Sequence, residues 1–115
     1  MAVDALSDVF GALADPTRRA LLTRLRAGDA TVAELAAPFQ ISQPAISRHL
    51  KVLEQAGLIS RRRRATARLS HLEAEPLRDA TAWLARYQAH WDERYDRLDT
   101  LLASLRDGHP GDAPG

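Results

Sequence analysis

Positive charge gathers in one short part of this 115-residue chain. Residues 61–64 are four consecutive arginines, Arg68 follows closely, and residues 42–72 together hold seven basic side chains against one acidic. The flanking segments, 1–41 and 73–115, carry net charges of −1 and −4, so the whole chain is only +1. Because a guanidinium presents a rigid fork of N–H donors that matches phosphate oxygens, this segment predicts an anionic partner.

The segment before the arginines has the pattern of a helix with two unlike faces. Ser42 suits the N-cap and Gly57 the position after the last turn, which predicts a helix over residues 42–56. Successive side chains turn by about 100°, so one face is apolar and the opposite face is small, polar and cationic. The apolar face consists of Ile46, Leu50 and Leu53, and the polar face of Gln43, Pro44, Ser47, Arg48 and Lys51.

The polar face has side chains that can contact DNA bases. Gln43 can make two hydrogen bonds with adenine, and Arg48 can do the same with guanine or hold a phosphate. Ser47 is short enough to let the helix come close to the duplex. An ordinary solvated surface is the alternative, and the arginines that follow make it the weaker one.

A short helix is expected just before this one. Thr31 and Glu34 stand three residues apart in a capping-box pattern, and Pro38 cannot continue the helix that they open. Residues 31–56 therefore have the order helix, turn, helix. In that arrangement the start of the second helix, the recognition helix, meets base edges in the major groove.

Residues 58–72, "LISRRRRATARLSHL", predict two short strands around a tip near residues 64–66. Alternation along a strand would place Arg61 and Arg63 on one face, and the even-numbered arginines on the other. A two-stranded wing with a cationic tip can reach phosphates or the minor groove beside the recognition helix. The expected wing contacts are Arg62, Arg64 and Arg68.

Helical patterns account for most of the remaining chain. An amphipathic pattern predicts a first helix over residues 3–14. A second helix is expected to follow its N-cap Asp15, with Pro16 as its first residue, and to close at Gly28. We therefore expect a mainly α fold with a small β-wing. The apolar face of the first helix consists of Leu6, Val9, Phe10 and Leu13.

The last predicted helix, over residues 76–107, has an apolar heptad stripe with more surface than one small domain can easily cover. These side chains either cover the chain's own core or pair with the same face of a second copy in a two-fold dimer. The chain's tryptophans and tyrosines all lie in this helix, at Trp83, Tyr87, Trp91 and Tyr95.

The chain resembles the ArsR/SmtB family of winged-helix bacterial transcriptional repressors in the stretches "ALADPTRRALLTRL", "VAELA" and "SQPAISRHLKVLEQAGLI". The resemblance covers about residues 5–105 and implies one winged helix-turn-helix domain over residues 1–107. It also implies a homodimer, built from the first and last helices, whose two recognition helices contact a palindromic operator. The chain would then be a sequence-specific regulator that represses its own or a neighbouring transcription unit.

The site residues expected on this basis form two sets. Double-stranded DNA and a second copy of the chain are the expected partners, no cofactor is expected, and a small-molecule effector is left open. The DNA-binding set is Ser42, Gln43, Pro44, Ser47, Arg48, His49, Lys51, Arg62, Arg64 and Arg68, and the dimerisation set is Leu6, Val9, Phe10, Leu84, Tyr87, Trp91, Leu98 and Leu101.

The chain departs from the family pattern in two places. Relatives usually carry a Gly-Arg pair at the wing tip, where this chain has Ala65 and Thr66. Many relatives bind a metal, and this chain has only part of their ligand set. It has no cysteine, and Asp79 rather than a histidine precedes His90 and Glu93. We therefore expect no metal, with a zinc site from these last three residues across a dimer as the alternative.

Other classes of function fit the sequence less well. The chain has no G-x-S-x-G, G-x-G-x-x-G or Walker motif, so an enzyme is not expected. Residues 42–72 contain no aromatic side chain to stack on bases, which argues against RNA. A winged-helix protein-interaction module without sequence-specific DNA binding remains an alternative.

Neither a membrane span nor a secretory signal is expected. No apolar run approaches about 20 residues, and the N-terminus carries acid rather than a basic region. We therefore expect a cytoplasmic, nucleoid-associated protein. The Gly- and Pro-rich tail at residues 108–115 is expected to be disordered.

Overall fold

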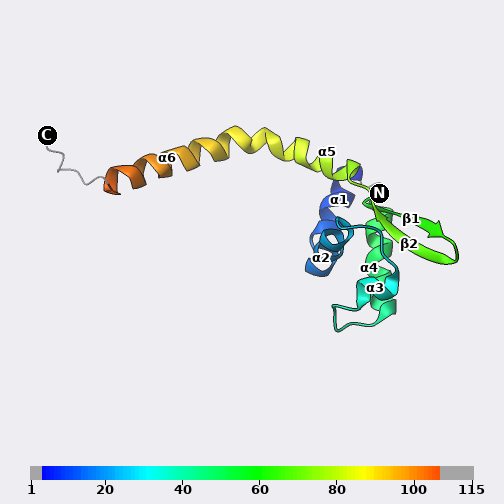
Figure 1. Cartoon of the computed structure of the whole chain (residues 1–115). Helices are drawn as coiled ribbons and strands as arrows, with labels where there is room; N and C mark the ends of the chain where they lie inside the picture. Colours follow the sequence, from blue (N-terminus) through cyan, green and yellow to red (C-terminus); the bar gives the residue numbers. More distant parts are fainter. Residues whose placement is uncertain (1–3, 107–115) are drawn as a thin grey trace, which may run out of the picture. The chain divides into compact units, whose positions relative to one another are not determined.

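The computed structural model describes residues 4–106 of the chain. Contacts divide this range into an N-terminal unit that ends at Thr81 and a C-terminal unit that begins at Ala82. The elements follow one another from blue to red in Figure 1. They are α1 (Ala5–Leu13), α2 (Pro16–Leu25), α3 (Val32–Ala36), α4 (Gln43–Gln55), β1 (Ile59–Arg64), β2 (Ala67–Leu72), α5 (Glu75–Leu84), the 3-10 helix η1 (Ala85–Tyr87) and α6 (Gln88–Arg106).

This order confirms the expected fold class, a mainly helical chain in which a helix-turn-helix precedes a two-stranded hairpin. Within the described residues, no helix is both long and apolar enough to cross a membrane. The domain limits expected from the sequence, one domain over residues 1–107, stay a prediction. The tail at residues 108–115 lies outside the described residues.

The helices of the N-terminal unit begin at side chains that cap them. The carboxylate of Asp15 and the hydroxyl of Ser42 accept hydrogen bonds of 3.0 and 3.3 Å from backbone N–H groups three residues later. At the start of α3, Glu34 accepts from the N–H of Thr31 at 2.8 Å, and the Thr31 hydroxyl accepts in return at 3.2 Å. These contacts confirm the predicted helix starts, because each cap satisfies donors that a helix cannot pair internally.

The structure refines two of the predicted helices. The α-helix of α2 ends at Leu25, and tighter three-residue turns continue the winding to Gly28, whose φ is +147°. The long helix predicted over residues 76–107 is present as α5 and α6, with the short 3-10 helix η1 between them. The rings of Trp83 and Tyr87, with centroids 5.3 Å apart, make contact across this tighter turn.

The hydrophobic core of the N-terminal unit is built around α4. This helix contacts α1, α2, α3 and β1, and its three predicted core residues are fully buried. Burial of each such side chain is worth about 1.5–3 kcal/mol, so the inner face holds α4 against its neighbours. The largest fully buried apolar side chains are Val9, Leu21, Leu35, Ile46, Leu50, Leu53 and Leu58.

Strands β1 and β2 form the predicted antiparallel hairpin, the wing. Its base is joined to the helices by two backbone hydrogen bonds between Ala30 and Ser70, of 3.2 and 2.8 Å. Its tip is Ala65 and Thr66, as expected, and Ala65 has a φ of 55°. This left-handed conformation is costly for any residue with a Cβ atom, so alanine is strained where relatives are expected to carry glycine.

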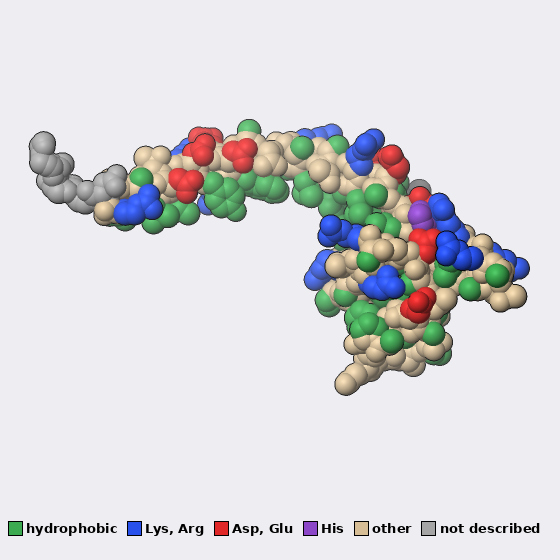
Figure 2. All heavy atoms as spheres, in the orientation of Figure 1, with side chains coloured by type: hydrophobic (Ala, Val, Ile, Leu, Met, Phe, Trp, Pro, Cys, Tyr) green, Lys and Arg blue, Asp and Glu red, His purple; other side chains and the backbone are tan. Residues whose placement is uncertain are grey.

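The C-terminal unit exposes its apolar side chains. No residue of α6 is buried, and hydrophobic side chains lie along one side of the helix while acidic ones lie along the other (Figure 2). We call the exposed large hydrophobic residues from the end of α5 through α6 the apolar stripe, and their exposed fractions run from 37% to 68%. The apolar stripe consists of Leu84, Tyr87, Trp91, Tyr95, Leu98, Leu101, Leu102 and Leu105.

Candidate nucleic-acid interface

The outer face of α4 has the composition predicted for a recognition helix. Gln43, Pro44, Arg48 and Lys51 are exposed, and Ser47 is half-buried. Because the opposite face of the same helix is fixed in the core, these side chains have a defined position on the surface. Proline is accommodated in the first turn, where its missing N–H would have no helical partner.

Most lysine and arginine side chains of α4 and of the wing lack acidic partners. Within residues 4–106, no lysine or arginine of α4 or the wing other than Arg61 has a carboxylate within ion-pair distance. Arg61 at the base of the wing is different, since its Nε lies 3.7 Å from a carboxylate oxygen of Glu54. We call the cations without acidic partners the cationic surface, and blue side chains gather at the wing in Figure 2. The cationic surface consists of Arg48, Lys51, Arg62, Arg63, Arg64 and Arg68.

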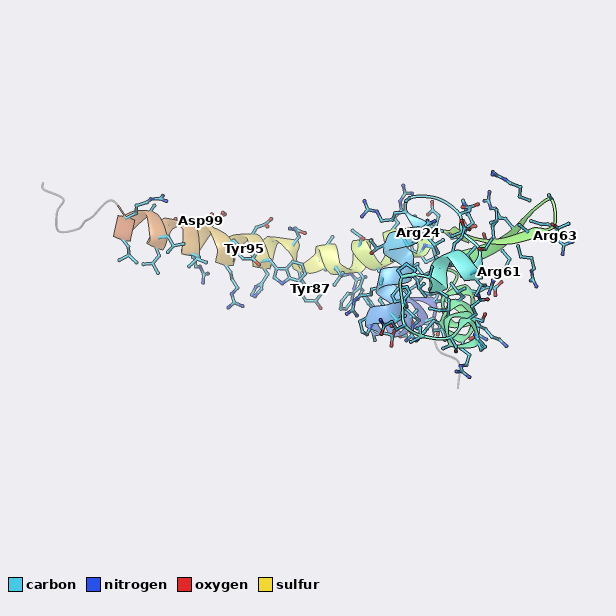
Figure 3. All side chains as sticks on the ribbon, turned by 60° about the horizontal axis from the view of Figure 1, so that its bottom comes forward. Arg24, Arg61, Arg63, Tyr87, Tyr95 and Asp99 are labelled. Atoms are coloured by element: carbon cyan, nitrogen blue, oxygen red, sulfur yellow. The ribbon has the colours of Figure 1, made fainter. Side chains whose placement is uncertain are left out.

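The register of the wing reveals a residue that the sequence-based set missed. Arg63 lies directly opposite Arg68 across the hairpin, and both side chains are exposed. In Figure 3, Arg63 lies near the tip of the wing and Arg61 lies closer to the helices. Like charges opposite each other on neighbouring strands destabilise a hairpin unless an anion lies between them. Counting outward from a tip at residues 65–66 could have paired the two arginines.

His49 is held by its own chain rather than fully exposed. Its Nδ1 lies 3.3 Å from Nη1 of Arg18 and 3.9 Å from a carboxylate oxygen of Asp15, and its side chain is 25% exposed. Both partners belong to the start of α2 or its cap. Direct phosphate contact by His49 stays a prediction, and these two contacts give the side chain a second role within the fold.

The predicted dimerisation residues are exposed in the C-terminal unit but buried or partly buried on α1. Leu84, Tyr87, Trp91, Leu98 and Leu101 all belong to the apolar stripe and are at least 37% exposed. Figure 3 labels Tyr87 and Tyr95 on this part of the chain. On α1, by contrast, Val9 is 2% exposed and lies in the core of its own unit, while Leu6 and Phe10 are partly buried against it.

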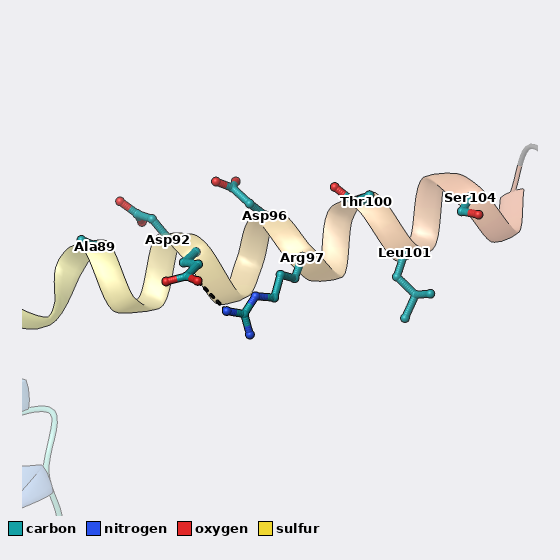
Figure 4. A pocket seen from close by; sticks show the side chains of 8 residues that line it. Ala89, Asp92, Asp96, Arg97, Thr100, Leu101 and Ser104 are labelled. Atoms are coloured by element: carbon teal, nitrogen blue, oxygen red, sulfur yellow. Dashed lines mark hydrogen bonds and ion pairs between the residues drawn. The ribbon is translucent and has the colours of Figure 1, made fainter.

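The described residues contain no group of three His, Cys, Asp or Glu side chains that could hold a metal ion. One concave surface lies along α6, from Ala89 to Ser104, and all its lining residues come from this single helix (Figure 4). There Glu93, part of the alternative zinc site, forms an ion pair with Arg97. A zinc site formed across two subunits by Asp79, His90 and Glu93 stays a prediction.

Sequence comparisons identify related proteins. The model of the bacterial regulatory protein family arsR matches residues 15–61. The transcriptional repressor SdpR of Bacillus subtilis is 39% identical over 82 residues, which are 71% of this chain and 91% of that protein. An HTH-type transcriptional regulator of Mycobacterium tuberculosis is 43% identical over 101 residues, which are 88% of each protein.

Solved structures agree with these relatives. The crystal structure of an ArsR family transcriptional regulator is 44% identical, with a TM-score of 0.70 over 77% of this chain and 98% of that one. The solution structure of a homodimeric winged helix-turn-helix DNA-binding domain from Mycobacterium bovis is 26% identical, with a TM-score of 0.59 over 82% and 84%. The fold, the order of its elements and these relatives together lead to one conclusion: the chain belongs to the ArsR family of bacterial regulatory proteins.

Proposed function

We propose that this protein is a homodimeric transcriptional repressor that binds a palindromic DNA operator. The observation that carries the proposal is the cationic surface. Its side chains lie on the recognition helix and the wing, and they have no acidic partner in the described chain. Such charges are free to replace the counterions that surround DNA phosphates. Relatives named as repressors support the regulatory role.

The recognition helix α4 supplies the sequence preference in this proposal. Its first turns enter the major groove, where Gln43 and Arg48 make hydrogen bonds with base edges and Ser47 allows a close approach. Ser42 and Lys51 hold phosphates on the rim of the groove. The hydroxyl of Ser42 can still donate to a phosphate, because as helix cap it acts only as an acceptor.

The wing supplies affinity more than sequence preference. Arg63 and Arg68 lie opposite each other on one face of the hairpin, and strand alternation assigns Arg62 and Arg64 to the other. A cationic tip with charge on both faces suits a groove bordered by phosphates on both sides. Phosphate contact would also relieve the repulsion between the two opposed arginines.

The apolar stripe supports the dimer. Water-exposed leucines and aromatic side chains at heptad spacing are stabilised when a second copy covers them with the same face. A two-fold dimer presents two recognition helices to half-sites about 34–36 Å, or one helical turn, apart. Occupation of an operator that overlaps a promoter then excludes RNA polymerase, and the protein acts on chromosomal DNA in the cytoplasm.

Selection of bound duplexes from a random pool, at physiological salt, tests this function. We expect an inverted repeat whose half-sites are about one helical turn apart. With about 6–10 phosphates contacted, the slope of log K against log[salt] is expected to be roughly −5 to −9. Salt-sensitive binding without sequence preference would overturn the repressor proposal and favour a protein-interaction or architectural module.

Two substitutions on α4 separate base contact from phosphate contact. Arg48→Ala is expected to weaken operator binding by about 1–3 kcal/mol per half-site and random-duplex binding much less, since Arg48 contacts a base. Lys51→Ala is the matched control, expected to weaken both about equally and to make the salt slope shallower. Equal losses on both duplexes for Arg48→Ala would assign Arg48 to phosphate instead.

A further inference from the structure

One arginine of α2 links three helices of the N-terminal unit. The guanidinium of Arg18 donates from Nε to the carbonyl of Ala12 at 2.8 Å and from Nη2 to the carbonyl of Gly11 at 3.2 Å. Both carbonyls belong to the last turns of α1. The third nitrogen of the same fork, Nη1, lies 3.3 Å from Nδ1 of His49 on the recognition helix. The rigid guanidinium thus connects the end of α1 to the middle of α4.

The contact with His49 defines the protonation state that it needs. A guanidinium can only donate, so Nδ1 of His49 must accept, which requires a neutral imidazole with its proton on Nε2. A protonated imidazole has a proton on both nitrogens and cannot accept from Arg18. The hydrogen bond between Arg18 and His49 therefore exists only while His49 is neutral.

A carboxylate lies close enough to pair with the protonated form of His49. A carboxylate oxygen of Asp15 lies 3.9 Å from the same Nδ1. The backbone N–H of Arg18, together with the nearby charges of His49 and Arg18, lowers the pKa of Asp15 below its ordinary value, although partial burial opposes this shift. The carboxylate therefore stays ionised at neutral and mildly acidic pH. Besides Arg18 and the cap residue Asp15, the neighbouring charged residues on these helices are Arg19 on α2, Arg48 on α4 and Asp8 on α1.

We propose that Arg18 is a positioning residue for DNA recognition, which holds α4 in its binding orientation through Nδ1 of His49 and ties that orientation to the end of α1. The inference rests on the proposed function, since it assigns to Arg18 and His49 the preorganisation of the surface that contacts the operator. A helix already held in the bound orientation loses less freedom on binding, which strengthens specific binding without any contact to DNA. Because α1 is one of the helices of the proposed dimer, the same link connects the dimer interface to the recognition helix.

A direct phosphate contact by His49 would give DNA binding the opposite pH dependence. If His49 held a phosphate, protonation would add a favourable charge and strengthen binding to any duplex at low pH. If His49 is the acceptor for Arg18, protonation releases that bond and weakens binding to the operator. The pH dependence of operator binding therefore decides between the two roles.

Substitutions of His49 supply the first test, with the operator recovered by selection and a random duplex as the two ligands. His49→Leu keeps bulk but removes the acceptor, and about a tenfold loss of operator affinity is expected with little change on the random duplex. His49→Asn can place its side-chain oxygen where Nδ1 stood and is expected to restore most of the loss. Equal losses for both variants, or equal losses on both duplexes, would overturn the proposal.

Arg18→Lys tests the other end of the link. Lysine keeps the positive charge but lacks the fork that reaches Ala12, Gly11 and His49 together, so operator affinity is expected to fall as in His49→Leu. Combining Arg18→Lys with His49→Leu should cost little more than either change alone, because both remove one link. Additive losses would contradict the proposal. Urea midpoints of each variant show whether the fold is retained.

A pH series on the wild-type protein and on His49→Asn completes the test. Protonation of His49 at low pH is expected to weaken operator binding by the wild type, while binding by His49→Asn stays nearly constant. Stronger wild-type binding at low pH would instead show phosphate contact. If the selection recovers no operator, the proposed function fails as well; if an operator is recovered and these variants bind it normally, only the role of Arg18 fails.

Discussion

The recognition helix α4 and the C-terminal helix α6 divide their polar and apolar side chains in opposite ways. On α4, Ile46, Leu50 and Leu53 are fully buried, while its cations are exposed without acidic partners. On α6 the large apolar side chains are exposed, and the charged pair Arg97 and Glu93 is satisfied within the helix. Each helix therefore leaves exposed the kind of side chain that its expected partner can bind.

The difference shows what each helix requires from outside the chain. The core already holds α4, so binding there adds charge neutralisation and base contacts to a fixed surface. The apolar stripe of α6 gains its burial only from another apolar surface, and a second copy of the same stripe is the proposed one. Five predictions, in order of decreasing expected effect, test the inner face of α4, the apolar stripe, the wing and the helix caps.

Leu50→Ala should destabilise the fold by about 2–5 kcal/mol, because it opens a cavity beneath α4 in a fully packed core. The free energy of unfolding, measured by urea denaturation at several protein concentrations, checks this value. Val52→Ala on the same helix, where the side chain is 37% exposed, is the control and should change stability by less than about 1 kcal/mol. Similar losses for the two variants would mean that the inner face of α4 is not its anchor.

Leu101→Glu should raise the dimer dissociation constant at least about a hundredfold, which corresponds to about 2.8 kcal/mol. Two-fold symmetry places both introduced carboxylates in the interface, where they lose water without gaining a partner. Sedimentation equilibrium measures the constant. Thr100→Glu adds the same charge at the neighbouring position outside the apolar stripe and should leave the dimer intact. A dimer that survives Leu101→Glu would exclude this stripe as the interface.

Arg63→Ala should reduce the steepness of the salt dependence of operator binding by about two for a dimer, since each subunit loses one phosphate contact. Binding titrations from low to high salt measure the slope. The control is Arg61→Ala, on the same face of β1 but paired with Glu54, and it should change the slope less. If Arg61→Ala has the larger effect, the base of the wing rather than its tip meets the duplex.

Ala65→Gly should stabilise the protein by about 0.5–1 kcal/mol, because the relief of left-handed strain exceeds the entropy that glycine adds to the unfolded chain. Urea denaturation measures the gain, and slower hydrogen exchange in β1 and β2 would assign it to the wing. Ala67→Gly, one residue into β2, has no such strain to relieve and should destabilise the hairpin. A loss of stability for Ala65→Gly would contradict the backbone conformation at the tip.

The smallest expected effect is a loss of stability at low pH. The pKa values of Asp15 and Glu34 are lowered from their ordinary 3.8 and 4.5, chiefly by the backbone N–H groups of Arg18 and Thr31. A lowered pKa in the folded state adds stability above the ordinary value, and this stability is lost as the pH falls through the folded value. The urea concentration at the unfolding midpoint should therefore decrease when the pH is lowered below about 4.5. Glu34→Gln keeps an acceptor without a titrating group, so its midpoint should fall less steeply with pH.

Local patterns in the sequence determined the elements of this protein. Asp15, Thr31 and Ser42 predicted the starts of three helices, because capping depends on residues only three positions apart. The apolar faces of α4 and of the C-terminal helix followed from helical periodicity in the same way. The composition of the recognition surface therefore follows from the order of residues along the chain.

Only the tertiary structure decided which of these side chains are already engaged. Arg18, Arg61 and Arg63 are chemically alike in the sequence, yet the first links α1 to His49, the second pairs with Glu54 and the third lies opposite another arginine. Partners that are 31 residues apart, as for Arg18 and His49, are fixed by how the helices pack and leave no periodic trace in the chain. Chain periodicity therefore shows where charges lie, and packing decides which of them remain free to bind.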